Sequence, residues 1–396
     1  MKIKILQVFC IIITIFICIF GSTHIYNFIK IKTATVKIIL KEDLTMEFLE
    51  QKKVSDFIQY LDGKIIDDTI IDSTEIGKKD ITFELYNKDN IKLKYSFQIE
   101  IKDKTEPTIW LGKKYSVPVN SEIDLTKKIL CGDNYDPNPT CKIEGFYDLN
   151  TVGEYPLIFR ATDNSENEET QEFTLTVYEP QPKEEKEKTN TDFEEIKKMY
   201  KNEKTRIGID ISNYQGDIDF EKIKDSGVEF VIIRIGFGHK EKYTIDKRFI
   251  KNIEAANMAG IDTGIYFFSY DNSIEEAKKS AKWVLNQIKN YKVKLPIAFD
   301  WEDWGNYNDY HLSFFGLTSM AEEFMNEIKK NGYDSMLYSS KAYLENIWLN
   351  KDTKIWLAHY SNQTNYQGNY EFWQICDNGK VNGIDTDVDI DIQYIK

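Results

Sequence analysis

The residues Asp300, Trp301 and Glu302 combine side chains that could do chemistry. They follow the apolar run at 295–298, a pattern typical of a buried strand that ends at acidic residues. Because side chains alternate along a strand, Asp300 and Glu302 would point the same way, with Cα atoms about 6.6–7 Å apart. Two carboxyls placed like this suit the cleavage of a glycosidic bond, one as a protonated acid and the other ionised. An acidic strand end that meets solvent is the plainer alternative, but the flanking Trp301 and Trp304 favour chemistry.

Two further acidic residues lie at predicted strand ends. Asp210 ends an apolar stretch, and Asp389 lies in an alternating stretch near the C-terminus. Helix candidates separate most of the strand candidates after residue 206, which favours a compact α/β barrel, although little helix separates the last strands. Since the first and last strands of a closed barrel are neighbours, Asp210 and Asp389 would meet Asp300 and Glu302 at one end of it. The strand candidates are 207–211, 230–235, 264–270, 297–300, 335–338, 355–358, 372–376 and 388–392.

Composition and charge exclude some classes of function. The 396-residue chain is long enough for two or three domains, and its net charge of −14, without a basic block, argues against nucleic acid binding. Five cysteines occur without a Cys-x-x-Cys pair, which argues against a zinc site. Cys131 and Cys141 would form a disulfide in an oxidising compartment, contributing roughly 3 kcal/mol through loop entropy. Two free thiols are the alternative.

Residues 1–32 are predicted to form a cytoplasmic N-terminus and a transmembrane signal anchor. Lys2 and Lys4 precede an almost unbroken apolar run from residue 5 to residue 20, and the run is long enough to span a membrane if it is extended to residue 28. No Ala-x-Ala cleavage site precedes residue 30, which favours a retained anchor over a cleaved signal peptide. The rest of the chain would then lie outside the cytoplasm.

Residues 33–179 have a different character. Short β-rich runs alternate with Asp, Asn and Gly turns, as is typical of β-sandwich modules, and their length predicts two modules, 33–104 and 105–179. The second resembles the bacterial immunoglobulin-like repeats of cell-surface proteins, through Thr-Val-Gly-Glu-Tyr at 151–155 and Asp-Asn-Ser-Glu-Asn at 163–167. The first resembles them more weakly. A charged, proline-flanked linker and a short helix, 180–205, lead to the C-terminal domain.

The C-terminal domain, residues 206–396, resembles the family 25 glycoside hydrolases, lysozymes that cleave peptidoglycan. The resemblance rests on a series of motifs that follow one another in the family's order. One departure is Asp391, where the family often has Asn, and we expect no effect on chemistry. The motifs are Gly-Ile-Asp-Ile-Ser at 208–212, Tyr-Gln-Gly at 214–216, the strand at 230–236, Gly-Ile-Tyr-Phe-Phe-Ser-Tyr at 264–270, Asp-Trp-Glu at 300–302, Trp-Leu-Ala-His-Tyr at 356–360, Phe-Trp-Gln at 372–374 and Val-Asp-Ile-Asp at 388–391.

This resemblance implies a flattened, TIM-like barrel of five β/α units plus extra strands, and cleavage of the β-1,4 bond between N-acetylmuramic acid and N-acetylglucosamine. Glu302 would protonate the leaving oxygen, while Asp300 would steady positive charge or orient the substrate's 2-acetamido group as an internal nucleophile. Asp210 and Asp389 would tune and position this pair. No metal or organic cofactor is implied. A substrate-binding wall, for which ordinary core packing is the alternative at each position, would comprise Tyr270, Tyr338, Trp356, His359, Tyr360 and Trp373.

Together these features predict a single-pass protein of the bacterial cell membrane, with its catalytic domain on the cell-wall side. Its partners would be peptidoglycan glycan strands and, through the N-terminal helix, the membrane. Two alternatives stay open: a non-catalytic surface protein that grips cell-wall glycan, and a glycosidase acting on another amino-sugar polymer such as chitin. The presence of all four acidic positions argues against the first.

Overall fold

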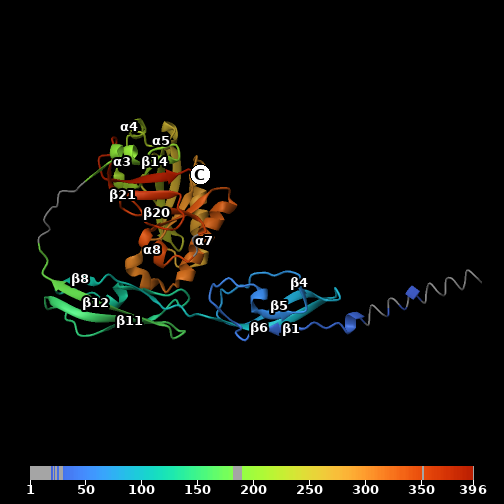
Figure 1. Ribbon diagram of the computed structural model, residues 1–396. Helices are drawn as coiled ribbons and strands as arrows, with labels where there is room; N and C mark the ends of the chain where they lie inside the picture. Colours follow the sequence, from blue (N-terminus) through green and yellow to red (C-terminus); the bar gives the residue numbers. More distant parts are fainter. Residues whose placement is uncertain are drawn as a thin grey trace, which may run out of the picture. The chain divides into compact units, whose positions relative to one another are not determined.

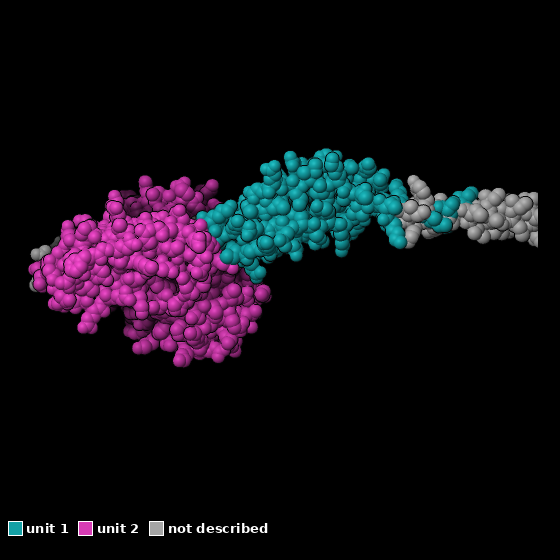
Figure 2. Space-filling view, turned by 90° about the horizontal axis from the view of Figure 1, so that it is seen from below, with its two compact units in different colours: residues 1–104 teal, residues 105–396 magenta. Residues whose placement is uncertain are grey.

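The structure, a computed structural model, describes residues 19, 20, 22, 25, 30–181, 190–349 and 352–395. The chain divides into two compact units, residues 1–104 and residues 105–396, coloured teal and magenta in Figure 2. The finer domain boundaries expected from the sequence stay predictions.

The expected signal anchor at residues 1–32 falls mostly outside the described residues. Within the described part of the chain, no helix combines the length and apolar character needed to cross a membrane. The predictions of a transmembrane helix and of single-pass membrane localisation are corrected on this finding.

The first unit is built from β-strands around its own apolar core. Strands β5 (Gly77–Asn87) and β6 (Lys92–Lys102) form a long antiparallel hairpin, in which buried and exposed side chains alternate as the two-residue period of a strand requires. The hairpin is flanked by β2 and β4, and β1 pairs with β3. The remaining elements are β1 (Ile38–Leu40), β2 (Thr45–Glu47), the 3-10 helix η1 (Val54–Phe57), β3 (Ile58–Leu61) and β4 (Gly63–Ile65).

The second unit begins with a small β module in residues 105–179. Its four-stranded sheet has the order β10–β11–β12–β8, and β7 pairs with β9 (Figure 1). A disulfide joins Cys131 to Cys141. The elements are β7 (Thr108–Trp110), β8 (Lys114–Pro118), α2 (Leu125–Lys128), β9 (Leu130–Gly132), β10 (Thr140–Glu144), β11 (Gly153–Thr162) and β12 (Glu168–Tyr178).

The rest of the second unit is a closed barrel of eight strands. Their order is β21–β20–β19–β18–β17–β15–β14–β22, and β22 pairs with β21 to close the barrel. Two short strands, β13 (Thr191–Asp192) and β16 (Lys242–Ile245), pair with β21 and β15. The barrel strands are β14 (Thr205–Ile211), β15 (Phe230–His239), β17 (Asp262–Ser269), β18 (Ile297–Asp300), β19 (Ser335–Ser340), β20 (Lys354–Ala358), β21 (Phe372–Lys380) and β22 (Val388–Tyr394).

Helices connect the parallel strands as far as β20. Several begin at a capping side chain, as at Ser273 and Ser313, whose hydroxyls accept a backbone N–H from the first turn of α6 and α7. Helix α5 ends at Gly260, whose φ of 72° suits a left-handed cap. The helices are α3 (Phe193–Tyr200), η2 (Asn213–Gln215), α4 (Phe220–Asp225), α5 (Phe249–Ala259), α6 (Ile274–Ile288), η3 (Trp304–Tyr310), α7 (Phe314–Lys330) and α8 (Lys341–Asn346).

The prediction of a TIM-like α/β barrel is wrong, and the fold class is corrected with it. A TIM barrel has eight parallel strands, each followed by a helix. Here β22 runs antiparallel to both β14 and β21, and the described residues 359–371 between β20 and β21 contain no helix. Antiparallel neighbours such as β21 and β22 need only a short turn, so no crossover helix is required there. Strands also outnumber helices along the described chain as a whole.

The barrel separates two apolar layers. One cluster fills its interior and includes Phe230, Met336 and Trp356, while a larger cluster lies between the strands and the helices. Along β14, Ile207, Ile209 and Ile211 belong to the outer cluster. Because side chains alternate, the intervening residues at 208 and 210 face the interior. The same alternation turns residues 298 and 300 of β18 inward.

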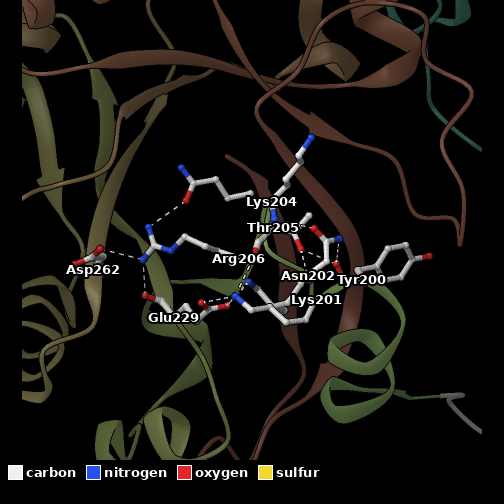
Figure 3. A network of polar contacts seen from close by, with 10 residues as sticks. Tyr200, Lys201, Asn202, Lys204, Thr205, Arg206, Glu229 and Asp262 are labelled. Atoms are coloured by element: carbon white, nitrogen blue, oxygen red, sulfur yellow. Dashed lines mark hydrogen bonds and ion pairs between the residues drawn. The ribbon is translucent and has the colours of Figure 1, made fainter. Parts of the chain in front are cut away.

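A polar network holds the N-terminal end of β14, away from Asp210 (Figure 3). The guanidinium of Arg206 donates to the carbonyl oxygen of Glu229 at 2.9 Å and to the Asp262 carboxylate at 2.9 Å. Lys201, just after α3, forms an ion pair with the Glu229 carboxylate at 2.7 Å. These contacts tie β14 to the end of α3, to the residue before β15 and to the first residue of β17, so they fix the strand that carries Asp210.

We predict that Gly208→Ala destabilises the barrel. A Cβ at residue 208 would lie 2.5 Å from both the ring and the carbonyl oxygen of Phe230, inside a packed core. Overpacking of this kind costs about 1–3 kcal/mol of unfolding free energy. Gly305→Ala is the matched control, because nothing lies within 4 Å of its would-be Cβ. Urea unfolding of both variants checks this, and equal midpoints would contradict it.

Candidate active site

Asp300 stands at the carboxyl end of β18, the most enclosed strand of the barrel. All four residues of β18 are buried, and Asp300 itself is 3% exposed. Its Oδ1 has no hydrogen-bond partner among the described residues. Burial, together with the nearby Glu302 and Asp210, raises the pKa of Asp300, while Arg234 opposes this shift. The Asp300 carboxyl is therefore buried with one oxygen free of protein partners in the described part of the chain, and its burial favours the protonated form.

Glu302 follows in the loop after β18 and faces a pocket. Its side chain reaches solvent through the pocket mouth, while protein atoms surround the carboxyl on its other sides and raise its pKa to about 6. Trp301 between the two acids points into the core, where its indole N–H donates to the Asp271 carbonyl at 3.1 Å. Trp304 packs on Trp301 with ring centroids 4.8 Å apart. The two tryptophans therefore fix the turn that presents Glu302.

Asp210 and Asp389 meet across the strand pair that closes the barrel. They are partners in the antiparallel register of β14 with β22, although they lie far apart in the sequence. Burial raises the pKa of Asp210, with Asp391 adding to the shift, and burial and then Asp210 raise the pKa of Asp389. Barrel closure thus brings these aspartates together, and Asp210 makes Asp389 harder to ionise.

A fourth aspartate, Asp391, belongs to the same group. It is fully buried and accepts a hydrogen bond from the indole N–H of Trp356 at 2.7 Å. Burial raises its pKa well above the ordinary value. Sequence reasoning noted Asp391 only as a departure expected to have no effect, but the structure places it next to Asp210, whose pKa it raises.

Gln374 of β21 connects the acids to the pocket. Its amide N–H donates to Asp210 at 2.7 Å, and its Oε1 accepts the hydroxyls of Tyr338 at 2.9 Å and Tyr360 at 3.0 Å. The amide orientation is therefore fixed from both ends. Sequence reasoning missed Gln374 as a functional residue, although the Phe-Trp-Gln motif at 372–374 contained the signal.

Two further residues near the acids were not singled out from the sequence. Arg234 of β15 contacts the Asp246 carboxylate at 2.8 Å and lowers the pKa of Asp300. Tyr266 of β17 packs on Trp356 with ring centroids 6.0 Å apart. An isolated Arg or Tyr in an apolar strand carries no pattern of its own, so only the closed barrel relates them to the acids.

The pocket beside Glu302 has a volume of about 510 Å³. Of the residues that the sequence proposed as a substrate wall, Tyr338, His359 and Tyr360 line it. Its remaining lining comes from β7, the ends of β19 and β20, and α8: Trp110, Ser340, Lys341, Ala342, Glu345, Asn346 and Ala358. The pocket thus presents the Glu302 carboxyl among aromatic and polar side chains.

The other expected wall residues lie elsewhere. Trp356 is buried beneath the acids and holds Asp391, as described above. Trp373 is also buried, and its indole N–H donates to the His359 carbonyl at 2.9 Å. Tyr270 is half-buried after β17, outside the pocket lining. Trp356 and Trp373 contact lining residues from behind, and the assignment of all three residues to substrate binding stays a prediction.

We predict that Asp391→Asn stabilises the fold at neutral and higher pH. Because the folded pKa of Asp391 lies above its unfolded value, the wild-type chain loses stability as pH rises from about 4 toward the folded pKa. Asparagine keeps an acceptor for Trp356 but has no charge to bury, so the gain at pH 8 should be on the order of 1 kcal/mol or more, and small at pH 4.

The measurement is urea unfolding of wild type and variant at both pH values. Asp225→Asn, an exposed position on α4, is the control for the change in net charge. A variant that is less stable than wild type at pH 8, or a gain that is the same at both pH values, would contradict the prediction.

The barrel region is similar in sequence to known proteins. The sequence of residues 209–384 matches the family described as glycosyl hydrolases family 25. An autolytic lysozyme of Clostridium acetobutylicum is 30% identical over 187 residues, covering 46% of this chain and 54% of the relative. Lysozyme M1 of Streptomyces globisporus is 27% identical over 199 residues, covering 46% of this chain and 65% of the relative. The chain therefore spans about half to two thirds of the length of these relatives.

Among solved structures, a family 25 glycosyl hydrolase from Bacillus anthracis aligns with a TM-score of 0.43 and 24% identity, covering 50% of this chain and 92% of that one. Residues 209–384 of this chain thus match the glycosyl hydrolases of family 25, and lysozymes are among the relatives that share this part of the chain.

Proposed function

We propose that this protein is a muramidase, which hydrolyses the β-1,4 bond between N-acetylmuramic acid and N-acetylglucosamine in peptidoglycan. The observation that carries the proposal is Glu302, a carboxyl with a pKa of about 6 that faces a pocket of about 510 Å³. Such a pKa keeps a carboxyl protonated in mildly acidic solution and lets it give up its proton during reaction. Family membership and the lysozymes among the relatives support the same class of substrate.

Glu302 acts as the general acid in this mechanism. Its proton passes to the glycosidic oxygen as the bond to the leaving sugar breaks, and positive charge develops at the anomeric carbon. The same carboxylate then accepts a proton from the water that completes hydrolysis. The packing of Trp301 and Trp304 supports this role, because it keeps the Glu302 turn in one position.

Asp300 stabilises the charge that develops. Its unpartnered, buried Oδ1 suits a hydrogen bond from the N–H of a substrate 2-acetamido group, which would orient that group as an internal nucleophile. Burial, Glu302 and Asp210 raise the pKa of Asp300, and Arg234 opposes this shift by favouring the ionised form. The pKa values of Asp210, Asp389 and Asp391 are raised as well. An ionised Asp300 would place negative charge beside the positive charge that develops in the transition state.

We predict that Glu302→Gln lowers kcat about 10²–10⁴-fold while the fold is retained, because the amide cannot supply the proton. Purified peptidoglycan is digested with the full chain, and mass analysis of the new reducing ends identifies the bond that is cut. Circular dichroism checks the fold. Wall lysis at the wild-type rate by a folded variant would overturn the role of Glu302, and new reducing ends on N-acetylglucosamine would overturn the bond specificity.

The pH dependence provides a second prediction. Since only protonated Glu302 donates, kcat/KM should fall about tenfold per pH unit above a pKa near 6. Rates on soluble wall fragments between pH 4 and pH 9 measure this limb. A rate that stays constant from pH 6 to pH 9 would exclude Glu302 as the titrating acid.

Asp300→Asn separates a hydrolase from a protein that only grips glycan. We predict a rate loss of about 10²–10³-fold with little change in affinity, because the lost charge serves the transition state and the bound sugar is neutral there. Rate on soluble fragments and affinity for insoluble wall are measured on the same protein. Loss of affinity without any wild-type rate to lose would favour the non-catalytic alternative.

A further inference from the structure

The pocket beside Glu302 has one wall from outside the family 25 region. Trp110 ends β7 of the small β module in residues 105–179, yet it lines the pocket together with Glu302, Tyr338 and Tyr360. The family match begins only at residue 209. A domain cut at that boundary would therefore lack part of its own pocket.

The module is joined to the barrel by directed hydrogen bonds. The Asn308 side chain in η3 accepts the backbone N–H of Cys131 at 3.0 Å and donates to the carbonyl oxygens of Ile129 at 2.8 Å and Thr126 at 3.1 Å. The backbone N–H of Phe314 donates to the Asp133 carbonyl at 2.7 Å. These bonds join β9, the partner strand of β7, to the loop that follows Glu302.

Apolar packing completes this contact. Leu130 of the module belongs to the core cluster of the barrel. The backbone at Gly132 passes so close to the barrel that a Cβ there would lie 2.5 Å from the ring of Phe314 and 2.8 Å from that of Tyr307. Gly132 therefore allows β9 to lie closer to these rings than a residue with a side chain would, and β9 pairs with β7.

Trp110 is the last of a series of contacting aromatic rings that extends to Trp301, the residue next to Glu302. Its ring packs on Tyr343 of α8 with centroids 5.3 Å apart, and Tyr343 stacks on Trp304 at 3.9 Å. Trp304 in turn packs on Trp301, next to Glu302. The indole of Trp110 is half-buried, so one part of it is fixed by Tyr343 while the remainder borders the pocket.

We propose that Trp110 is a substrate-positioning residue that stacks on a sugar ring of the glycan, so that the β module forms part of the substrate-binding cleft. The proposal rests on the proposed function in that it takes the ligand to be an amino-sugar glycan. Aromatic rings carry a large apolar face at little cost in conformational entropy, which suits the apolar face of a pyranose. Lys341 and Glu345, paired at 2.6 Å in the same lining, supply polar contacts beside it.

The consequence is a preference for chain length. A short glycan can occupy the part of the pocket at Glu302 without reaching Trp110, whereas a longer strand contacts both. Loss of the indole should therefore weaken binding of long substrates and leave short ones nearly unchanged, and it should act on KM rather than on kcat.

The test compares Trp110→Leu, Trp110→Tyr and wild type in the full chain. Leucine keeps apolar volume against Tyr343 but removes the flat ring, and tyrosine restores a ring. On long soluble glycan strands we expect Trp110→Leu to raise KM about fivefold to tenfold with kcat within about twofold of wild type, and Trp110→Tyr to recover most of the loss. On disaccharide-repeat fragments of minimal length, KM should change less than about twofold. Phe146→Ala is the matched control, because Phe146 is an aromatic residue of the same module, 80% exposed and outside the pocket lining.

An unchanged KM on long strands in Trp110→Leu would overturn the proposal. So would an equal loss of kcat on all lengths, which would indicate a structural role. Asn308→Ala is an independent variant that keeps the indole of Trp110 but removes the hydrogen bonds between η3 and β9. It should also raise KM on long strands. A wild-type KM on long strands in this variant would count against the proposal.

Binding measurements separate this inference from the proposed function. Calorimetry on Glu302→Gln, with and without Trp110→Leu, uses the same glycan fragments and needs no turnover. A fivefold or greater loss of affinity for long fragments supports stacking by Trp110 even if the wild-type chain cuts nothing, in which case only the proposed function fails. If the wild-type chain cuts the glycan, but Glu302→Gln binds long fragments equally well with and without Trp110→Leu, only the Trp110 proposal is overturned.

Discussion

Closure of the barrel by β22 is the constraint on which the site depends. Strand β22 is antiparallel to both of its neighbours, and its register sets Asp389 directly opposite Asp210. The same strand carries Asp391 inward to Trp356. Without this closure, β14 and β21 would be open edges, and the acids would stand at separate places in solvent. With it, they share one desolvated end of the barrel, beside Asp300.

Burying these carboxyls opposes folding, because each charged form loses its hydration. The raised pKa values of Asp210, Asp300 and Asp391 reflect that cost, since protonation is how buried carboxyls avoid it. The apolar layers inside and outside the barrel supply the opposing stability. Buried carboxyls with raised pKa values are typical of functional sites. Their burial lowers the stability of the fold, but a carboxyl with a raised pKa can hold and donate a proton in a reaction.

The β module contacts the site from outside the region that matches family 25. Its contacts fall on η3 and the start of α7, which directly follow the turn that presents Glu302. The module therefore supports the acid's loop from outside while Trp301 supports it from inside. A pocket wall supplied by Trp110 gives this arrangement a further consequence, in that the reach of the cleft is determined by a separate part of the chain.

The sequence by itself determined the local chemistry and the family. Asp300 and Glu302 could be recognised because strand alternation and the flanking tryptophans are local features, and the family resemblance is confirmed because motifs in order survive low identity. Two expectations that rested on local patterns alone were wrong. Alternating strands and helices suggested a TIM-like barrel, but strand direction at β22 depends on pairing with distant strands. Apolar character at the N-terminus suggested a membrane helix, which the described residues do not contain.

Only the tertiary structure related Gln374, Arg234 and Asp391 to the acids, because inward-facing residues become neighbours once the sheet closes. It also assigned Trp356 and Trp373 to the supporting layer and brought Trp110 to the pocket. The physical reason is general to this chain. Residue type and periodicity can be read along the sequence, whereas desolvation and proximity arise from packing between segments that are distant in the sequence.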